Sequence, residues 1–269
     1  MNQRHFKFTL LGTGSSGGVP RVGGDWGACD PTEPRNRRTR CSALVETWTT
    51  PDARTTILID TSPDMREQLL SAEVTRIDAV LFTHDHADQT HGIDDIRALA
   101  IRNRAQVDAF MDEATSQTLL PKFRYVFEGD KGYPPIYRLQ PYISAYDPVS
   151  VDGSGGVIET LPLQQEHGKI NSLGFRFGNL AYCNDVNGLP ERTLEHLQGL
   201  DVLVLDALRY TPHPSHANLD QALKWIAALK PRRAVLTNLH VDLDYQTLVD
   251  TLPMGVEPGF DGWAYEAML

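Results

Sequence analysis

The sequence predicts one α/β (α+β) domain, in which two β-rich halves carry helices on their outside. Short apolar runs that end in polar residues recur in both halves, and segments with helical spacing of apolar residues lie between them. The 269 residues are 41% apolar and 22% charged, so the chain can bury a substantial core. Because no short repeat, low-complexity segment or linker interrupts it, we expect a single domain over residues 1–269.

In the first half, apolar runs bounded by turn residues predict strands at residues 6–11, 41–47, 55–60, 79–82 and 107–111. The second and third of these are expected to pair. A helix is expected to begin at Ser62 as N-cap, because Pro63 and Asp64 follow in the first turn. A second helix is expected over 93–103. Residues 121–155, punctuated by aromatic residues, proline and glycine, are left unassigned.

The second half repeats this pattern. We expect strands at residues 157–161, 173–177, 180–183, 202–206 and 234–237. We expect helices at residues 190–197, 219–229 and 245–252. Near the start of the chain, a glycine-rich loop over 12–20 allows close backbone approach to a ligand, although a plain surface turn is an equal alternative.

The most informative segment, 84–91, holds three histidines and two aspartates within eight positions. It directly follows the apolar run 79–82, so we expect the motif at a strand end, where side chains two apart share a face. Imidazole suits zinc and similar transition metals, and carboxylate suits harder ions. The motif therefore predicts a metal site of the hydrolytic type, rather than a solvated polar loop.

Further ligand-type residues follow strands in the second half or precede a helix. These residues are His167, Asp185, Asp206, His213, His216 and His240. Each of them, taken singly, is as readily a capping or solvated polar residue. Their order along the chain, combined with the 84–91 motif, is what makes them candidate site residues.

That order resembles the metallo-β-lactamase superfamily, whose fold is a four-layer αββα sandwich with metal ligands at strand ends. Within the superfamily the chain is most similar to the PhnP family of cyclic phosphodiesterases, and more distantly to ribonuclease Z. The resemblance covers nearly the whole chain. The segments that carry it are 11–14, 36–42, 58–60, 84–91, 184–190 and 259–262.

The resemblance implies two divalent metal ions, zinc or manganese. His84, His86 and His167 would hold one ion, Asp88 would hold the second, and Asp185 would bridge the two. Asp60 fits the superfamily's first acidic position, which is more structural than ligating.

For catalysis, the resemblance makes His216 the general acid that faces the leaving group, with Asp88 and Asp185 beside it. His213 and Ser16 are expected to contact substrate. Asp85, Asp94 and Asp206 are candidate carboxylates that orient the histidines. Asp94 is equally well explained as a residue of the first turn of a helix.

The implied activity is hydrolysis of a small, cyclic phosphodiester by a metal-bound hydroxide, with an anionic phosphodiester as the binding partner. Three alternatives stay open. The chain could cleave a thioester, lactone or β-lactam with the same fold. It could instead be a metal-binding member without activity, or a cofactor-assembly protein of the PQQ-biosynthesis type.

Two positions depart from the family pattern. Gln89 stands where the family has a histidine for the second metal ion, and an amide oxygen is a poorer zinc ligand than imidazole. We therefore expect Gln89 to give a weaker, more manganese-tolerant second site, with His91 as a conceivable substitute. Asn238 occupies the place of the last ligand histidine. His240 lies two residues on and is expected to take over that role.

Composition limits the partners. The formal net charge of −10 argues against a nucleic-acid polymer as partner. The basic cluster over 35–40 is a local exception that is best explained as a solvated loop. The first residues lack a signal-peptide core, no apolar run reaches membrane-spanning length, and the three cysteines form no disulfide framework. We expect a cytoplasmic protein with no membrane contact, and a homodimer is an open alternative.

Overall fold

The computed structural model describes residues 4–269, and these residues divide into two compact units. The first unit comprises the N-terminal segment through Leu11, Ser42–Glu159 and Gly262–Leu269. The second comprises Gly12–Cys41 and Thr160–Asp261. Neither unit is one uninterrupted half of the sequence. Stretches of the two units alternate along the chain. The prediction of a single domain over 1–269 stays a prediction.

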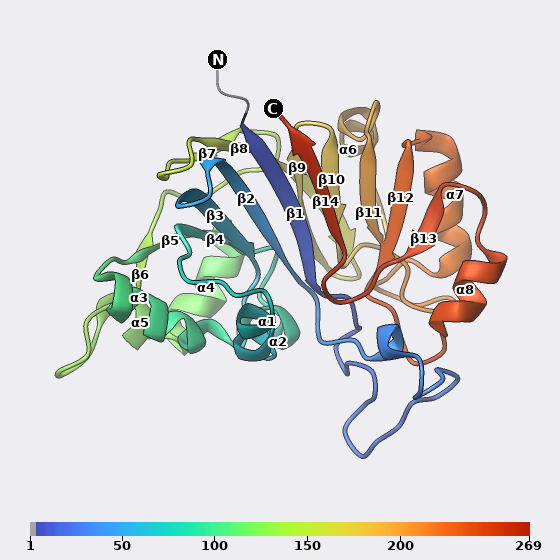
Figure 1. Cartoon of the computed structure of the whole chain (residues 1–269), viewed down its shortest axis with the longest axis horizontal. Coiled ribbons are helices and arrows are strands. Elements are labelled where there is room, and N and C mark those ends of the chain that lie inside the picture. Colours follow the sequence, from blue (N-terminus) through green and yellow to red (C-terminus); the bar gives the residue numbers. More distant parts are fainter. Residues whose placement is uncertain (1–3) are drawn as a thin grey trace. The chain divides into compact units, whose positions relative to one another are not determined.

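A mixed seven-stranded sheet forms the first unit, in the order β14-β1-β2-β3-β4-β5-β6 (Figure 1). Its strands are β1 (His5–Gly12), β2 (Ser42–Thr50), β3 (Ala53–Ile59), β4 (Ala79–Leu81), β5 (Val107–Phe110), β6 (Tyr137–Leu139) and β14 (Ala264–Met268). The predicted pairing of the second and third strands is confirmed as an antiparallel ladder. From β3 to β6 the neighbouring strands are parallel, so their carboxyl ends lie at one edge.

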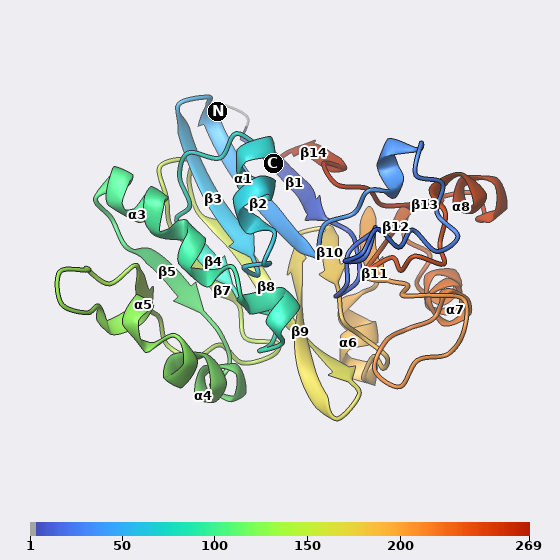
Figure 2. The same ribbon diagram turned by 90° about the horizontal axis from the view of Figure 1, so that it is seen from below.

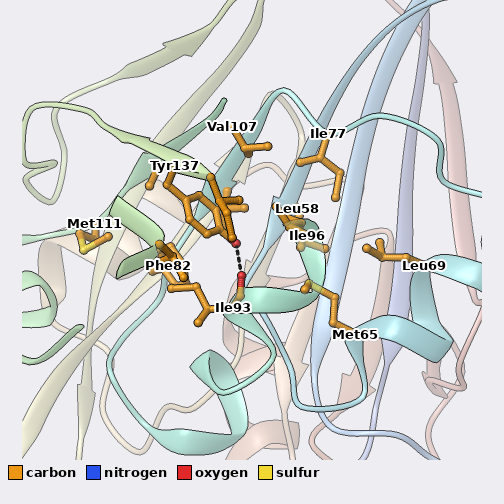
Figure 3. Close-up of a cluster of buried hydrophobic side chains, with 14 of the residues drawn as sticks. Leu58, Met65, Leu69, Ile77, Phe82, Ile93, Ile96, Val107, Met111 and Tyr137 are labelled. Atoms are coloured by element: carbon orange, nitrogen blue, oxygen red, sulfur yellow. Dashed lines mark hydrogen bonds between the residues drawn. The ribbon is translucent and has the colours of Figure 1, made fainter. Parts of the chain in front are cut away.

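Helices cover one face of this sheet (Figure 2). They are α1 (Met65–Ser71), α2 (Ala87–Thr90), the 3₁₀ turn η2 (Ile93–Ile96), α3 (Arg97–Asn103), α4 (Glu113–Lys122) and α5 (Arg124–Glu128). Between helices and sheet lies a core in which Met65, Phe82 and Ile96 pack against strand residues such as Leu58 (Figure 3). The buried Tyr137 hydroxyl donates a hydrogen bond to the Ile93 carbonyl at 2.8 Å.

A second mixed sheet has the order β13-β12-β11-β10-β9-β8-β7. Its strands are β7 (Val149–Val151), β8 (Ile158–His167), β9 (Ile170–Phe177), β10 (Leu180–Cys183), β11 (Val202–Asp206), β12 (Arg233–Thr237) and β13 (Val256–Pro258). The second unit contains its strands from β9 to β13 and most of β8, whereas β7 falls within Ser42–Glu159 of the first unit. From β10 to β13 the neighbouring strands are parallel. The helical elements of the second unit are η1 (Pro34–Asn36), α6 (Glu191–His196), α7 (Leu219–Leu229) and α8 (Tyr245–Thr251).

Two local predictions were wrong. The first helix begins at Met65 rather than just after Ser62, because the Ser62 hydroxyl accepts a hydrogen bond from the Asp64 N–H at 3.1 Å and closes a turn before the helix. The 84–91 motif does not continue a strand, because β4 ends at Leu81 and α2 begins at Ala87. Among the described residues, none of the helices combines the length and the apolar character needed to cross a bilayer.

Candidate active site

In the first unit, Asp60 and Thr83 fix the position of His84. β3 and β4 are parallel neighbours, so the residues that follow them lie side by side. The buried Asp60 carboxylate accepts hydrogen bonds from the N–H and the hydroxyl of Thr83, both at 2.8 Å. The Thr83 hydroxyl oxygen lies 2.9 Å from His84 Nδ1. A proton on Nδ1 leaves the lone pair of His84 on Nε2, the nitrogen available to a metal ion.

Burial raises the pKa of Asp60 to about 8, although the hydrogen bonds from Thr83 favour its ionised form. A positive charge held by His84 would also favour the ionised carboxylate, because opposite charges stabilise each other in a buried site. The residue therefore acts as a support for His84, in agreement with its expected structural role.

The rest of the motif lies in the loop and in α2. The rings of His84 and His86 meet edge to face, with centroids 4.4 Å apart, so the period-two argument holds for this pair. Asp88, however, lies in the first turn of α2 rather than on extended backbone. Gln89 is buried, and its amide lies 3.4 Å from Asp88 Oδ2, a long contact. Asp94 pairs with Arg97 at 2.6 Å, which supports its interpretation as a helix residue.

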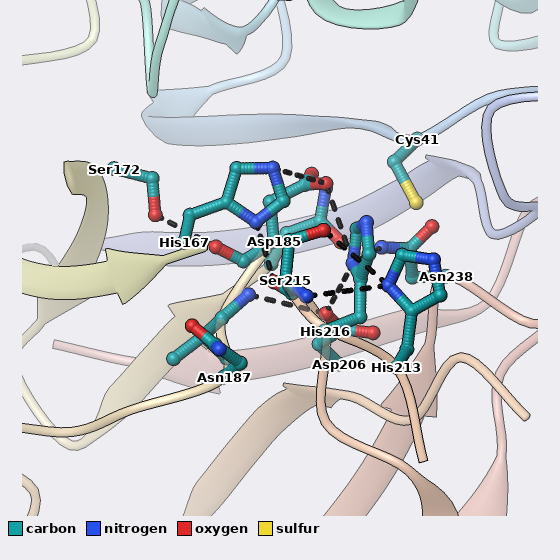
Figure 4. Close-up of polar contacts among 12 residues, drawn as sticks. Cys41, His167, Ser172, Asp185, Asn187, Asp206, His213, Ser215, His216 and Asn238 are labelled. Carbon is teal, nitrogen blue, oxygen red and sulfur yellow. Dashed lines mark hydrogen bonds and ion pairs between the residues drawn. The ribbon is translucent and has the colours of Figure 1, made fainter. Parts of the chain in front are cut away.

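In the second unit, three polar residues come together at the carboxyl ends of neighbouring parallel strands (Figure 4). Asp185 follows β10, Asp206 ends β11 and Asn238 follows β12. Asp185 and Asn238 both have a positive φ, 52° and 63°, a region in which Asp and Asn are among the best-tolerated side chains. The strand ends thus turn sharply and gather these side chains at one edge.

His167 has the hydrogen bonding that is typical of a metal ligand. It ends β8, and its Nδ1–H donates to the Ser215 carbonyl at 2.6 Å. This leaves Nε2, which lies 3.9 Å from Asp185 Oδ1. Asn184 donates to the other carboxylate oxygen of Asp185 at 2.6 Å. A divalent ion between His167 Nε2 and Asp185 Oδ1 fits this pair, because each ligand atom is held from behind by a protein group.

His216 forms a histidine–carboxylate pair with Asp206. Its Nδ1 lies 2.8 Å from Asp206 Oδ2 and 3.6 Å from Asp185 Oδ1. Asp206 Oδ2 also accepts from the Val186 N–H at 3.1 Å. Burial raises the pKa of Asp206, while His216, the Val186 N–H and Asn238 favour its ionised form. The pair fixes the His216 ring and leaves its Nε2 as the nitrogen that can exchange a proton.

The structure thus brings His167, Asp185 and His216 together, with one ligand-type atom of each within 4.8 Å of the others. His213 lies beside them, with its ring centroid 5.1 Å from that of His216, and burial lowers its pKa. Ser16 is exposed in the turn of the glycine-rich loop. The roles of His213 and Ser16 stay predictions.

His240 is placed differently from the expectation. Its Nδ1 lies 3.2 Å from Asp242 Oδ2, and its Nε2 contacts Arg21. Burial lowers the pKa of His240. Asn238, not His240, contacts the His216–Asp206 pair, with Asn238 Nδ2 3.1 Å from His216 Nδ1.

Sequence reasoning gave Asp261 no role, although the structure places it under the glycine-rich loop. One of its oxygens accepts from the N–H and hydroxyl of Thr13, at 2.9 and 2.8 Å. The other accepts from the N–H and hydroxyl of Thr39, at 2.7 and 2.6 Å. Burial raises the pKa of Asp261 to about 6. The sequence offered one signal for this role of Asp261. Thr13, which is flanked by glycines, and Thr39, which is flanked by arginines, both lie in segments that carry the family resemblance.

Comparisons with known proteins identify the family and the fold. Residues 55–238 match the family described as Beta-lactamase superfamily domain. A solved structure of a new diphosphatase from the PhnP family is 33% identical, with a TM-score of 0.88 over 98% of either chain. Zn²⁺-bound PqqB from Methylobacterium extorquens shares the fold at 16% identity, with a TM-score of 0.73 over 96% of this chain and 99% of the other.

Among curated proteins, an octanoyltransferase from Porphyromonas gingivalis is 33% identical over 258 residues. The match covers 94% of this chain and 50% of the relative. The chain therefore spans about half the length of this curated relative.

Proposed function

The chain belongs to the β-lactamase superfamily, and from this premise we propose that it hydrolyses small phosphodiesters, cyclic ones included, in a metal-dependent reaction. The family match confirms the PhnP-like resemblance and the predicted α/β fold class of the metallo-β-lactamase type. At the level of the family it is a hydrolase. The bond that it cleaves is our proposal.

The observation that carries the proposal is the His216–Asp206 pair beside Asp185. A histidine whose Nδ1 is bonded to a buried carboxylate can hold a proton on Nε2 and release it to a departing group. An alkoxide leaving group, such as a sugar oxygen, needs that proton. A similar solved structure is that of a diphosphatase from the PhnP family. Hydrolysis of a diphosphate, like that of a phosphodiester, breaks a P–O bond.

The other candidate residues would bind the metal ion or hold its ligands in position. When bound, a divalent ion would supply Lewis-acid chemistry, activating water and offsetting negative charge on a phosphoryl oxygen. His167 and Asp185 are the second unit's residues for that ion, and His84, His86 and Asp88 are the first unit's predicted ligands. Support from Ser215, Asn184 and the Asp60–Thr83 pair limits the rotation of these side chains.

The experiment compares leaving groups in the wild type and in the variant His216→Ala, with added Mn²⁺ or Zn²⁺. A 2′,3′-cyclic nucleotide and a dinucleoside diphosphate test the natural bond types, and bis(p-nitrophenyl) phosphate offers a leaving group that needs little protonation. We expect His216→Ala to lose about 10²–10⁴-fold in kcat on the cyclic nucleotide and much less on the nitrophenyl ester.

His196→Ala is the matched control, because His196 is the last residue of α6 and is not one of the candidate site residues. It should retain wild-type rates on both substrates. Absence of any phosphoester turnover by metal-loaded wild type would reject the proposal.

A second candidate function is thioester hydrolysis, and the octanoyltransferase relative is the observation that favours it. The match covers 50% of that relative, whose name refers to an acyl group, so an acyl thioester is the second substrate class to test. A thiolate leaves without a general acid more readily than an alkoxide does. His216→Ala should therefore spare octanoyl-thioester hydrolysis, whereas it should impair the opening of a cyclic phosphate.

A further inference from the structure

Asn238 belongs to the hydrogen-bond network of His216. The side chain is 2% exposed, and Nδ2 lies 3.1 Å from His216 Nδ1. His216 Nδ1 donates to Asp206, and the Asn238 side chain also forms a hydrogen bond with the Asp206 carboxylate. The amide orientation is set by that acceptor, because an amide oxygen turned toward a carboxylate would be repelled.

His240 has no nitrogen left for a metal ion. An imidazole ligates through a nitrogen lone pair, and its other nitrogen is normally held by a protein group. In His240 both nitrogens have protein partners, Asp242 on Nδ1 and Arg21 on Nε2. Arg21 is itself held near Asp25, at 3.7 Å, so His240 forms part of a connected surface network.

His216 is excluded by the orientation of its ring rather than by the number of its partners. Its Nδ1 is the atom nearest to Asp185, and that nitrogen donates to Asp206. His167 differs, because its Nδ1 is held by the Ser215 carbonyl and its Nε2 faces Asp185. Of the four residues His167, Asp185, His216 and His240, His167 and Asp185 are those whose hydrogen bonding fits a metal ion.

We infer that the second unit supplies two metal ligands, His167 and Asp185, while Asn238 positions the His216–Asp206 pair and His240 positions Arg21. The chain accordingly binds one zinc ion tightly rather than two. Gln89 in the first unit acts in the same direction, because it places an amide where the second ion was predicted to find an imidazole. The inference rests on the proposed metal dependence, and it does not depend on which bond is cleaved.

The test is the zinc content of purified protein, measured by elemental analysis and native mass spectrometry after gel filtration. We expect about one zinc per wild-type chain, and the same content in Asn238→Ala, Asn238→Ser and His240→Ala. His167→Ala should lose zinc. Asn238→His, which places an imidazole at a backbone angle that histidine tolerates, should raise the content toward two.

Two tightly bound zinc ions in the wild type would overturn the inference, and so would loss of zinc from Asn238→Ala or His240→Ala. Circular dichroism of each variant separates a lost ligand from a lost fold, and Asn238→Ser serves if Asn238→Ala is unstable. Zinc content needs no substrate. A wild type with one zinc and no phosphoester turnover would reject the proposed function and leave this inference standing.

Discussion

At the scale of single residues, Asp60 shows how a buried carboxylate can act on a metal site without touching the metal. It accepts both hydrogen bonds from Thr83, and the Thr83 hydroxyl contacts His84 Nδ1. Replacing Asp60 by asparagine turns one acceptor into a donor, which disturbs the Thr83 hydroxyl and the tautomer of His84. We expect Asp60→Asn to weaken zinc binding about 10–100-fold, as measured by competition with a chelating dye.

Asp94→Asn is the matched control in the same unit. Asp94 pairs with Arg97 instead of with a group that touches a histidine of the motif, so its variant should keep wild-type zinc affinity. Equal affinities in Asp60→Asn and the wild type would show that Thr83 alone orients His84.

The candidate site residues that the sequence indicates are those whose own chemistry suits a metal ion. Density and spacing singled out His84 and His86, and strand-end position singled out Asp185. The roles of Asn238 and His240 could not be separated, because both lie near the end of β12 and only the hydrogen-bond partners distinguish them. Asp261 was missed because a residue that holds a loop by accepting hydrogen bonds carries no spacing signal.

At the scale of elements, the loop before α1 and the end of α2 are joined by backbone contacts that require a glycine. Gly92 donates its N–H to the Thr61 carbonyl at 2.9 Å, and Thr61 donates to the Gln89 carbonyl at 2.8 Å. A Cβ on Gly92 would come within 2.0 Å of the Ser62 carbonyl oxygen. Backbone rather than a flexible side chain fills that space, so the loop itself must move.

We therefore expect Gly92→Ala to lower the free energy of unfolding by about 1–3 kcal/mol, measured by urea denaturation. Gly17→Ala is the control. The nearest atom to its added Cβ, at 3.3 Å, belongs to the flexible side chain of Arg21, so its effect should stay within about 0.5 kcal/mol. Similar losses in both variants would mean that the Gly92 contact is not a specific constraint.

Asp261 gives an element-scale prediction for pH. Its folded pKa of about 6 lies above its ordinary value of 3.8, so the folded state holds a proton that the unfolded chain has released between those pH values. The wild type therefore loses this contribution, about 1–3 kcal/mol, as pH rises from about 4 to about 6.

The Asp261→Asn variant carries an amide in place of the carboxyl group, so it has no proton to release in this pH range. It should be the less stable protein at every pH, because its amide group faces N–H and hydroxyl donors from Thr13 or Thr39. Its deficit relative to wild type should shrink as pH rises from 4 to 6. Urea denaturation at several pH values measures this difference, and a deficit that is constant with pH would contradict the assignment.

Strands and helices could be predicted from the sequence where turn residues bounded an apolar run. Most strands and the amphipathic helices α7 and α8 lie within a few residues of the predicted ranges. The short strands β6 and β7, within the unassigned 121–155, and the C-terminal strands β13 and β14 were missed. Three to five residues with mixed burial do not establish a period, and pairing with a neighbouring strand, such as that of β14 with β1, is what stabilises them.

At the scale of the whole molecule, the superfamily resemblance was confirmed, whereas the division into two interleaved units was not foreseen. The backbone pairing of β1 with β14 places both ends of the described chain in the first unit. Sequence patterns are local, and such exchange of terminal segments depends on pairing between residues more than 250 positions apart, which no local period reveals.

The final prediction concerns metal removal. The candidate ligands His167 and Asp185 come from the ends of two different strands, β8 and β10, and folding must bring them together before a metal ion can bind. A ligand that binds only the folded state stabilises it by about 2.7 kcal/mol when present at 100 times its dissociation constant. For a chain of this size, each kcal/mol shifts the unfolding midpoint by about 2–4 °C. Chelation by EDTA should therefore lower the midpoint by about 5–10 °C, measured by calorimetry.

His167→Ala should abolish most of this shift, because it removes the imidazole whose Nε2 faces Asp185. His196→Ala, which changes a histidine of α6, should show the full shift. Identical midpoints with and without EDTA in zinc-loaded wild type would mean that no metal ion couples to folding. In that case the hydrogen bonds that hold His84 and His167 would serve the apo fold alone, and the metal dependence of the proposed reaction would lose its structural basis.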